Sequence, residues 1–158
     1  MNARPIRLIA DSMLGRLAKA LRMLGFDVAY DPFAEDRELI RQAREDGRVM
    51  LTRDTGLMRR RDLPRHVFVE SDHVREQLAQ VARELGLKLD QRAAFTRCIV
   101  CNEPLDEVAK ELVREQVPPY VYRTQERFAR CPGCGRIYWR GTHIAGMERN
   151  IEQFGGEQ

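Results

Sequence analysis

Lysine is scarce in this chain of 158 residues, which holds 27 lysines and arginines in total but only Lys19, Lys88 and Lys110 as lysines. Its cations are therefore almost all guanidinium groups, which suit bidentate contacts with phosphate oxygens. The formal net charge is only +3, so net charge by itself does not indicate a nucleic-acid partner. The cations are concentrated, because residues 1–97 carry 19 Lys and Arg against 15 Asp and Glu, whereas residues 98–158 carry 8 against 9.

Long apolar runs are also missing. No stretch approaches the roughly 20 apolar residues that span a bilayer, and the N-terminal stretch "MNARPIRLIADSM" has too short an apolar core for a signal peptide. The composition, 43% hydrophobic and 32% charged, is typical of a globular protein. We therefore expect a cytoplasmic protein with no membrane partner, built as one domain or one domain plus a small appendage.

Cysteine is limited to two close pairs, "CIVC" and "CPGC", with none to spare. In a chain without an export signal, two such pairs indicate a zinc site rather than disulfides. Four thiolates fill the tetrahedral coordination shell of zinc, so the predicted role of the metal is structural. The predicted ligands are Cys98, Cys101, Cys131 and Cys134. Gly133 and Gly135 suit a tight turn around the second pair, and the long separation between the pairs predicts a short helix in the insert.

The order of the predicted elements indicates an α/β fold with a parallel sheet flanked by helices. Apolar periodicity predicts strands at residues 6–11, 27–31, 48–54 and 66–71, and helices at 12–25, 34–47 and 72–87. The pattern changes near Lys88, so we place a first domain at residues 1–92 and a zinc-ribbon domain at 93–158. In the second domain the sequence predicts a short helix over 105–113 and two β segments joined by the second cysteine turn.

Carboxylates follow the predicted strands of the first domain. Asp11, Asp54 and Asp72 stand at strand ends, and Asp36 opens the second helix on the same edge of the sheet. Ligands of open parallel sheets bind beyond the carboxyl ends of the strands. Converging carboxylates would repel one another without a cation between them, and magnesium and manganese prefer such oxygen ligands. We therefore predict a catalytic site with two divalent cations, of the kind that activates a water for phosphoryl displacement.

Arginines near these carboxylates are the predicted contacts for a polyanionic substrate. The predicted substrate-binding residues are Arg16, Arg53, Arg59, Arg60 and Arg61.

Less specific interpretations remain open for the same residues. Asp36 and Asp72 each precede a helix, where aspartate commonly caps free amides. Asp54 is also compatible with the start of a short helix. Ser12 could cap the first helix in place of Asp11, so that the Asp11 carboxylate would not be needed as a cap. The run of arginines at 59–61 is compatible with a solvated face, and the aromatic residues at 138 and 139 with either RNA stacking or packing inside the ribbon.

The ordered motifs "ADSMLGRLAKALRMLGFD", "GRVMLTRD" and "CPGCGRIYWRGTH" resemble the Mut-seven C-terminal ribonuclease-domain family, a PIN-like domain followed by a zinc ribbon. The resemblance covers nearly the whole chain. It implies a parallel sheet with an acidic pocket and divalent-metal-dependent cleavage of RNA. The matching acidic positions are Asp11, Asp36 and Asp54, whereas the motif around Asp72 is a looser match. His143 matches the end of the last motif, and its role stays open.

The predicted function is hydrolysis of RNA phosphodiester bonds by a metal-activated water. A non-catalytic RNA-binding or ribosome-associated module with the same fold is the alternative, and it would bind RNA without metal-dependent products. A toxin-type nuclease with a neutralising antitoxin-like partner and a homodimer also stay open. The sequence does not distinguish an endonuclease from an exonuclease.

Overall fold

The computed structural model describes residues 5–88, 90 and 92–140. The chain divides into two compact units. Unit 1 comprises Met1–Arg22 and Phe26–Lys88, and unit 2 comprises Met23–Gly25 and Leu89–Gln158. None of the helices in the described ranges is long and apolar enough to cross a membrane.

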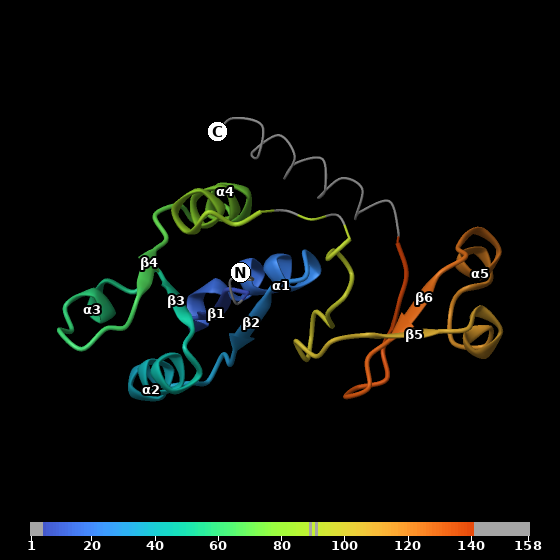
Figure 1. The fold of residues 1–158 in the computed structure, drawn as a ribbon, viewed down its shortest axis with the longest axis horizontal. Helices are drawn as coiled ribbons and strands as arrows, with labels where there is room; N and C mark the ends of the chain where they lie inside the picture. The colour runs from blue at the N-terminus through green and yellow to red at the C-terminus, as the bar shows by residue number, and fades with distance from the viewer. Residues whose placement is uncertain (1–4, 89, 91, 141–158) are drawn as a thin grey trace. The chain divides into compact units, whose positions relative to one another are not determined.

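Unit 1 is built on a four-stranded sheet with the order β2-β1-β3-β4 (Figure 1). The strands are β1 (Arg7–Ala10), β2 (Asp27–Tyr30), β3 (Val49–Thr52) and β4 (His66–Phe68). All three pairings between neighbouring strands are parallel, which confirms the parallel sheet predicted from the alternation of strands and helices.

Helices cover both faces of this sheet. They are α1 (Gly15–Met23), preceded by the short η1 (Ser12–Leu14), α2 (Asp36–Asp46), α3 (Thr55–Met58) and α4 (Val74–Leu85). Leu8 and Leu51 pack on the side of α1 and α4, whereas Ile9 and Met50 pack on the side of α2 and α3. Because the central strands β1 and β3 are buried on both faces, they lie in continuous apolar runs of the sequence.

The strand order reverses between β1 and β3. The chain goes from β1 to β2 on one side and then crosses to β3 on the other side. In open α/β sheets, ligands bind at such a switch point, beyond the carboxyl ends of the two strands. The residues that follow Ala10 and Thr52 are therefore the best-placed candidates for a site.

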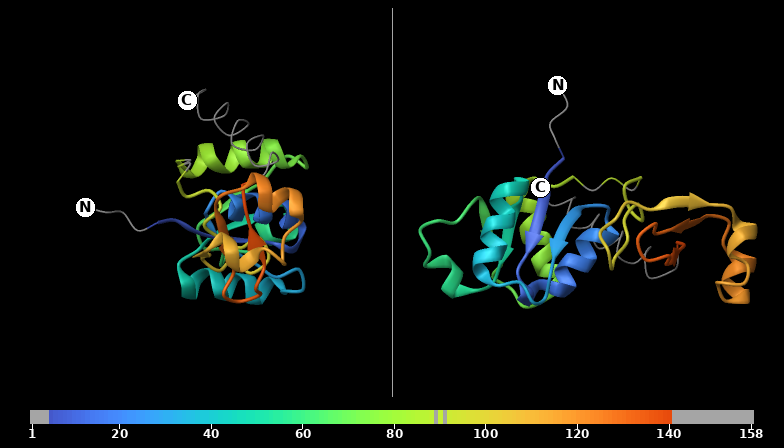
Figure 2. Two further views of the ribbon diagram at one scale, coloured as in Figure 1. Left: turned by 90° about the vertical axis from the view of Figure 1, so that its right-hand side faces the viewer. Right: turned by 90° about the horizontal axis from the view of Figure 1, so that it is seen from below.

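Unit 2 contains a three-stranded antiparallel sheet with the order β5-β6-β7. Its strands are β5 (Asp106–Val108), β6 (Phe128–Arg130) and β7 (Ile137–Tyr138). The short helices η2 (Lys110–Val113) and α5 (Pro119–Thr124) connect β5 to β6 at one end of these strands (Figure 2). One short helix was predicted in the insert between the cysteine pairs, and the structure has two there, η2 and α5.

Two local predictions in unit 2 differ from the structure. The helix predicted over 105–113 is wrong in its first half, because Asp106–Val108 pairs with Phe128–Arg130 as a strand. A pairing partner 20 residues away along the chain outweighs the local preference of a short segment. The segment at Pro119–Thr124 was not predicted as a helix, although proline suits the first helical turn.

Candidate functional site

Asp11 lies directly after β1 and is only 4% exposed. Its amide donates to the carbonyl oxygen of Leu51 at 3.0 Å, which ties the end of β1 to β3. Its Oδ1 accepts a hydrogen bond from the amide of Met13 at 2.8 Å, and its Oδ2 accepts one from the amide of Arg53 at 2.9 Å. The hydroxyl of Thr52 also donates to Oδ2. Three donors thus hold this carboxylate in one orientation.

Thr52 links Asp11 to the second strand-end aspartate. Its side chain is fully buried, and its hydroxyl donates to Asp11 while it accepts from the amide of Asp54 at 2.9 Å. Asp54 is half-buried, and its Oδ1 accepts from the amide of Gly56 at 2.8 Å. The structure therefore places Asp11 and Asp54 at adjoining strand ends, joined through one hydroxyl group. Thr52 was not predicted as a site residue, although it is the last residue of β3 and precedes Asp54 by two positions.

The predicted helix caps lie on different residues from those expected. Asp36 is the first residue of α2 rather than its cap, and the cap position of α4 is taken by His73. The side chains that cap helices are instead those of Asp11, on η1, and Asp54, on α3. The capping interpretation was wrong for Asp36 and Asp72, and both helices begin two residues after the start that the apolar periodicity predicted.

Asp36 and Asp72 are both exposed to solvent. The Oδ1 of Asp72 lies 3.5 Å from Nε2 of His73. Among the described residues, the four cysteines are the one group of three or more potential ligands whose atoms lie within 4.8 Å of one another. The catalytic and metal-binding roles of the aspartates therefore stay predictions.

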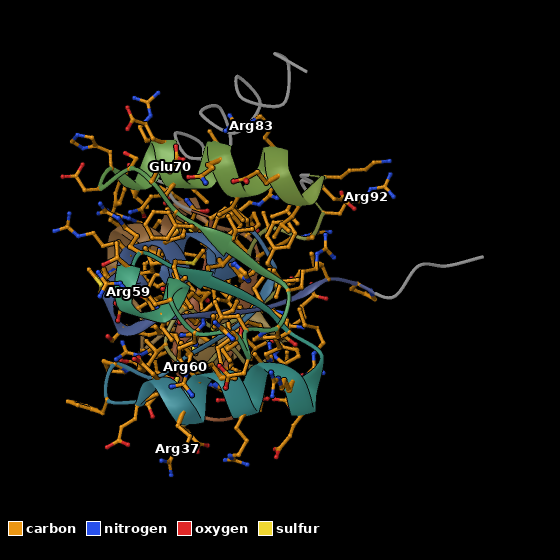
Figure 3. All side chains as sticks on the ribbon, turned by 90° about the vertical axis from the view of Figure 1, so that its left-hand side faces the viewer. Arg37, Arg59, Arg60, Glu70, Arg83 and Arg92 are labelled. Carbon is orange, nitrogen blue, oxygen red and sulfur yellow. The ribbon has the colours of Figure 1, made fainter. Side chains whose placement is uncertain are left out.

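The predicted substrate-binding arginines differ in what they contact. The guanidinium group of Arg53 donates to the carbonyl oxygen of Glu70 at 3.4 Å, beyond the end of β4. Arg60 forms two hydrogen bonds with Asp62, at 3.1 and 3.2 Å, which raise the pKa of Arg60 and lower the pKa of Asp62. Figure 3 shows Arg59 and Arg60 at the end of the sheet where α3 lies. The side chains of Arg16, Arg59 and Arg61 are exposed, and within the described ranges none of them forms an ion pair.

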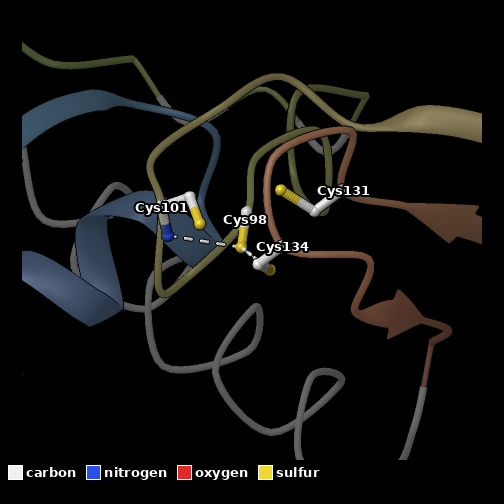
Figure 4. A group of neighbouring side chains, drawn as sticks. All are labelled: Cys98, Cys101, Cys131 and Cys134. Carbon is white, nitrogen blue, oxygen red and sulfur yellow. Dashed lines mark hydrogen bonds between the residues drawn. The ribbon is translucent and has the colours of Figure 1, made fainter.

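The four cysteines of unit 2 form the predicted cluster. Their Sγ atoms all lie within 4.8 Å of one another and come from two separate loops (Figure 4). The Sγ atoms of Cys98 and Cys134 are 3.7 Å apart. A tetrahedral zinc with Zn–S bonds of about 2.3 Å requires sulfurs about 3.8 Å apart. The donor set and its spacing therefore fit zinc.

The two cysteine loops have the same backbone design. The carbonyl oxygen of Cys98 accepts from the amide of Asn102 at 2.9 Å, and that of Cys131 accepts from the amide of Gly135 at 2.8 Å. Both residues have a positive φ, 64° at Asn102 and 78° at Gly135. Glycine adopts this conformation freely, and asparagine is among the few other residues that tolerate it. The glycine was predicted in this role, whereas the matching asparagine was not.

Tyr138 supports the cysteine cluster from β7. Its hydroxyl accepts from the amide of Ile99 at 3.1 Å and lies 3.0 Å from Sγ of Cys98. Burial opposes ionisation of the Cys98 thiol, but the hydrogen bonds from Tyr138 and from the amide of Cys101 outweigh it and lower the pKa of Cys98 to about 7. A hydroxyl placed against a thiolate ligand in this way orients it and stabilises its charge.

The aromatic pair of the ribbon is partly structural. The ring of Trp139 packs against the buried Phe128, with centroids 6.4 Å apart and planes at 56°. His143, whose role stayed open in the sequence, lies outside the described residues.

Comparison with known proteins agrees with this architecture. The sequence matches the Mut7-C RNAse domain family over residues 6–151. It is 29% identical over 119 residues to a human protein, "Exonuclease mut-7 homolog", and this similarity covers 72% of the present chain. The matched region is only 14% of that relative's length. No solved structure matches the chain. Because the family match covers nearly all of both units, the chain belongs to the Mut7-C RNAse domain family.

Proposed function

We propose that this protein is a ribonuclease that hydrolyses RNA phosphodiester bonds at the carboxyl ends of β1 and β3. The observation that carries the proposal is the pair of aspartates, Asp11 and Asp54, joined through the buried Thr52 hydroxyl at the switch point of the sheet. Membership of an RNase-domain family supports nuclease activity on RNA.

Asp11 and Asp54 would hold a divalent cation, magnesium or manganese, through hard carboxylate oxygens. A carboxylate offers about four lone-pair sites, and Asp11 uses three of them in hydrogen bonds. Oδ2 of Asp54 accepts no hydrogen bond within the described part of the chain. When bound, such a cation supplies an activated water and offsets the charge that develops on the phosphate. Asp36 and Asp72 are proposed as further catalytic carboxylates at the same edge of the sheet.

The arginines of unit 1 would bind the RNA backbone. Arg53 lies closest to the pair, because its own amide donates to Asp11. Arg16, Arg59 and Arg61 are exposed and offer guanidinium groups to phosphate oxygens. Arg60 contributes less, because Asp62 already offsets its charge. Binding through these side chains weakens steeply as salt rises.

The four cysteines are the proposed ligands of a zinc ion with a structural role. All four coordination positions are filled by thiolates, so no position is left for a substrate or a water. The chemistry is therefore assigned to unit 1, and the cytoplasmic location expected from the sequence stays a prediction.

Asp54→Asn is the sharpest test of the active site. Asparagine caps helices as well as aspartate does, so the hydrogen bond from the amide of Gly56 to this side chain is retained. We expect the free energy of unfolding to change by less than about 0.5 kcal/mol. Manganese-dependent cleavage of a labelled RNA should fall by two orders of magnitude or more, because the negative charge that holds the cation is lost.

Asp106→Asn is the matched control, since Asp106 is an exposed carboxylate in β5 and belongs to unit 2. It should cut RNA at the rate of the unchanged protein. Equal cleavage by Asp54→Asn and Asp106→Asn would falsify the proposed site. If the unchanged protein binds RNA with a steep salt dependence but gives no metal-dependent products, the non-catalytic alternative is correct.

A further inference from the structure

A pocket of about 610 Å³ lies in unit 2, apart from the cysteine cluster. Residues of all three strands of the β5-β6-β7 sheet contribute to its lining. Glu107, Ala129 and Tyr138 are paired across the three strands and therefore point to the same face. Ala129 stands in the central strand between Glu107 and Tyr138, and all three residues line the pocket. Pockets that bind small organic groups have volumes of roughly 300–1,000 Å³.

Aromatic rings form the walls of this pocket. Phe95 and Trp139 both line it and are half-buried, so part of each ring is accessible. Phe95 has a φ of 65°, a left-handed conformation that is rare for a bulky residue. Its amide donates to the carbonyl oxygen of Met23 at 3.0 Å, which holds the backbone in that conformation. Backbone strain of this kind concentrates at ligand sites.

Three arginine side chains also line the pocket. Arg92, Arg127 and Arg140 line the pocket, against the single carboxylate of Glu107. The guanidinium group of Arg140 lies 5.7 Å from the centroid of the Phe95 ring. The side chains of Arg92 and Arg127 are exposed, and neither forms an ion pair with any described carboxylate. The pocket therefore combines flat apolar surfaces with an excess of positive charge.

We propose that this pocket binds a nucleobase of single-stranded RNA, stacked on an aromatic ring, with the adjoining phosphates on Arg92 and Arg127. Stacking on aromatic side chains beside a cationic rim is how proteins hold single strands with little sequence preference. The inference rests on the proposed function, since it assumes that RNA is the substrate. It adds a binding site for RNA in unit 2, separate from the proposed site of cleavage in unit 1.

The fluorescence of Trp139 tests this directly, because the chain contains a single tryptophan. The protein is titrated with a single-stranded oligoribonucleotide at low salt, without added divalent cation. We expect RNA to quench the Trp139 emission. Ala129→Leu adds bulk to the lining of the pocket without changing the charge, and it should weaken RNA binding about tenfold or more, as the loss of one stacked base does.

Substitutions that remove one positive charge test the proposed phosphate contacts of Arg92 and Arg127. Arg92→Gln and Arg127→Gln should each weaken binding and reduce the slope of log affinity against log salt by about 0.7, the value for one phosphate contact on a single strand. Arg123→Gln is the matched control, because Arg123 is exposed on α5 and does not line the pocket. Phe95→Leu, which keeps apolar bulk but removes the ring, guards against misfolding of the Ala129 variant. Zinc content and thermal unfolding are measured for each protein.

Two results would overturn the inference. One is an unchanged Trp139 emission when RNA binds, and the other is equal RNA affinity for Ala129→Leu, Phe95→Leu and Arg123→Gln. An acidic peptide of equal charge is the second probe, and a peptide that quenches Trp139 more tightly than RNA also contradicts a nucleobase site. Asp54→Asn should still bind RNA and quench Trp139. If RNA quenches Trp139 but the unchanged protein does not cut RNA, the pocket is supported and the proposed nuclease activity is rejected. If the protein cuts RNA without quenching of Trp139, the nuclease activity is supported and the pocket is rejected.

Discussion

The two units of this protein are stabilised in different ways. Unit 1 buries two apolar clusters, one of twelve residues and one of six, on opposite faces of its sheet. Among the described residues, the cluster in unit 2 has three buried members, Val113, Val117 and Phe128. Burial of apolar surface is the main favourable term in folding, so unit 1 has a core of its own. The core of the described part of unit 2 is small, so we expect bound zinc to contribute much of the stability of this unit.

Removal of zinc is the largest expected perturbation. Structural zinc contributes on the order of 10 kcal/mol, which is comparable with the whole stability of an ordinary domain. A strong chelator, or Cys131→Ser, should therefore unfold unit 2 while unit 1 stays folded. The emission of Trp139 should shift to the red, whereas most of the helical circular dichroism should remain, because α1, α2 and α4 all lie in or almost wholly within unit 1.

The proposed difference in stabilisation between the two units is contradicted if both units unfold together without zinc, or if neither unit unfolds. Return of the Trp139 emission on adding zinc back shows that the chelator acted through the metal. Cys98 and Cys131 are fully buried, so slow release of the metal is expected and the measurement must run to completion.

The sequence predicted the fold of unit 1 better than that of unit 2, and the reason is physical. In unit 1, the central strands β1 and β3 are apolar and α1, α2 and α4 each have an apolar stripe, so local pattern and tertiary environment agree. In unit 2, the segment Asp106–Val108 carries two acidic residues and becomes a strand only because it pairs with β6. Long-range pairing of this kind leaves little trace in the local sequence.

In the candidate site, too, some features could be predicted from the local sequence and others could not. The strand ends predicted that Asp11 and Asp54 would approach each other, because sheet topology fixes where carboxyl ends lie. Thr52 was not predicted, since a buried threonine in a strand is unremarkable until its two hydrogen-bond partners are seen. Relief of repulsion between carboxylates would by itself leave the stability of Asp11→Asn unchanged or raised. The structure indicates the opposite, because an amide at Asp11 would face a hydrogen-bond donor.

Thr52→Val gives the next largest effect and tests the link between the two aspartates. Valine has the shape of threonine without the hydroxyl, so the carboxylate of Asp11 and the amide of Asp54 each lose a buried partner. We expect unit 1 to lose about 1–3 kcal/mol in denaturant unfolding. Manganese-dependent cleavage should fall as well, because the orientation of Asp11 relaxes.

Thr52→Ser restores the hydroxyl and should recover most of the cleavage rate, which a purely apolar packing role for Thr52 does not explain. Thr124→Val is the matched control in unit 2, where the hydroxyl donates to the carbonyl oxygen of Tyr120 at 2.9 Å on an exposed helix. That change should cost less than about 0.5 kcal/mol. Equal losses at the two positions would show that burial of the Thr52 hydroxyl does not matter.

The smallest effect concerns the turns that hold the metal. Gly135 has a φ of 78°, and a Cβ added there meets nothing within 4 Å, so any cost of substitution comes from the backbone alone. Gly135→Ala should destabilise unit 2 by about 1–2 kcal/mol. Gly135→Asn should cost less, because Asn102 already adopts this conformation in the matching turn. Gly133→Ala is the control, since its Cβ makes only ordinary contacts, the nearest at 3.6 Å. The rate of zinc release to a chelator measures all three. If the alanine and asparagine variants at 135 release zinc at the same rate, the left-handed conformation is not what the turn requires, and the likeness between the two cysteine loops has no energetic meaning.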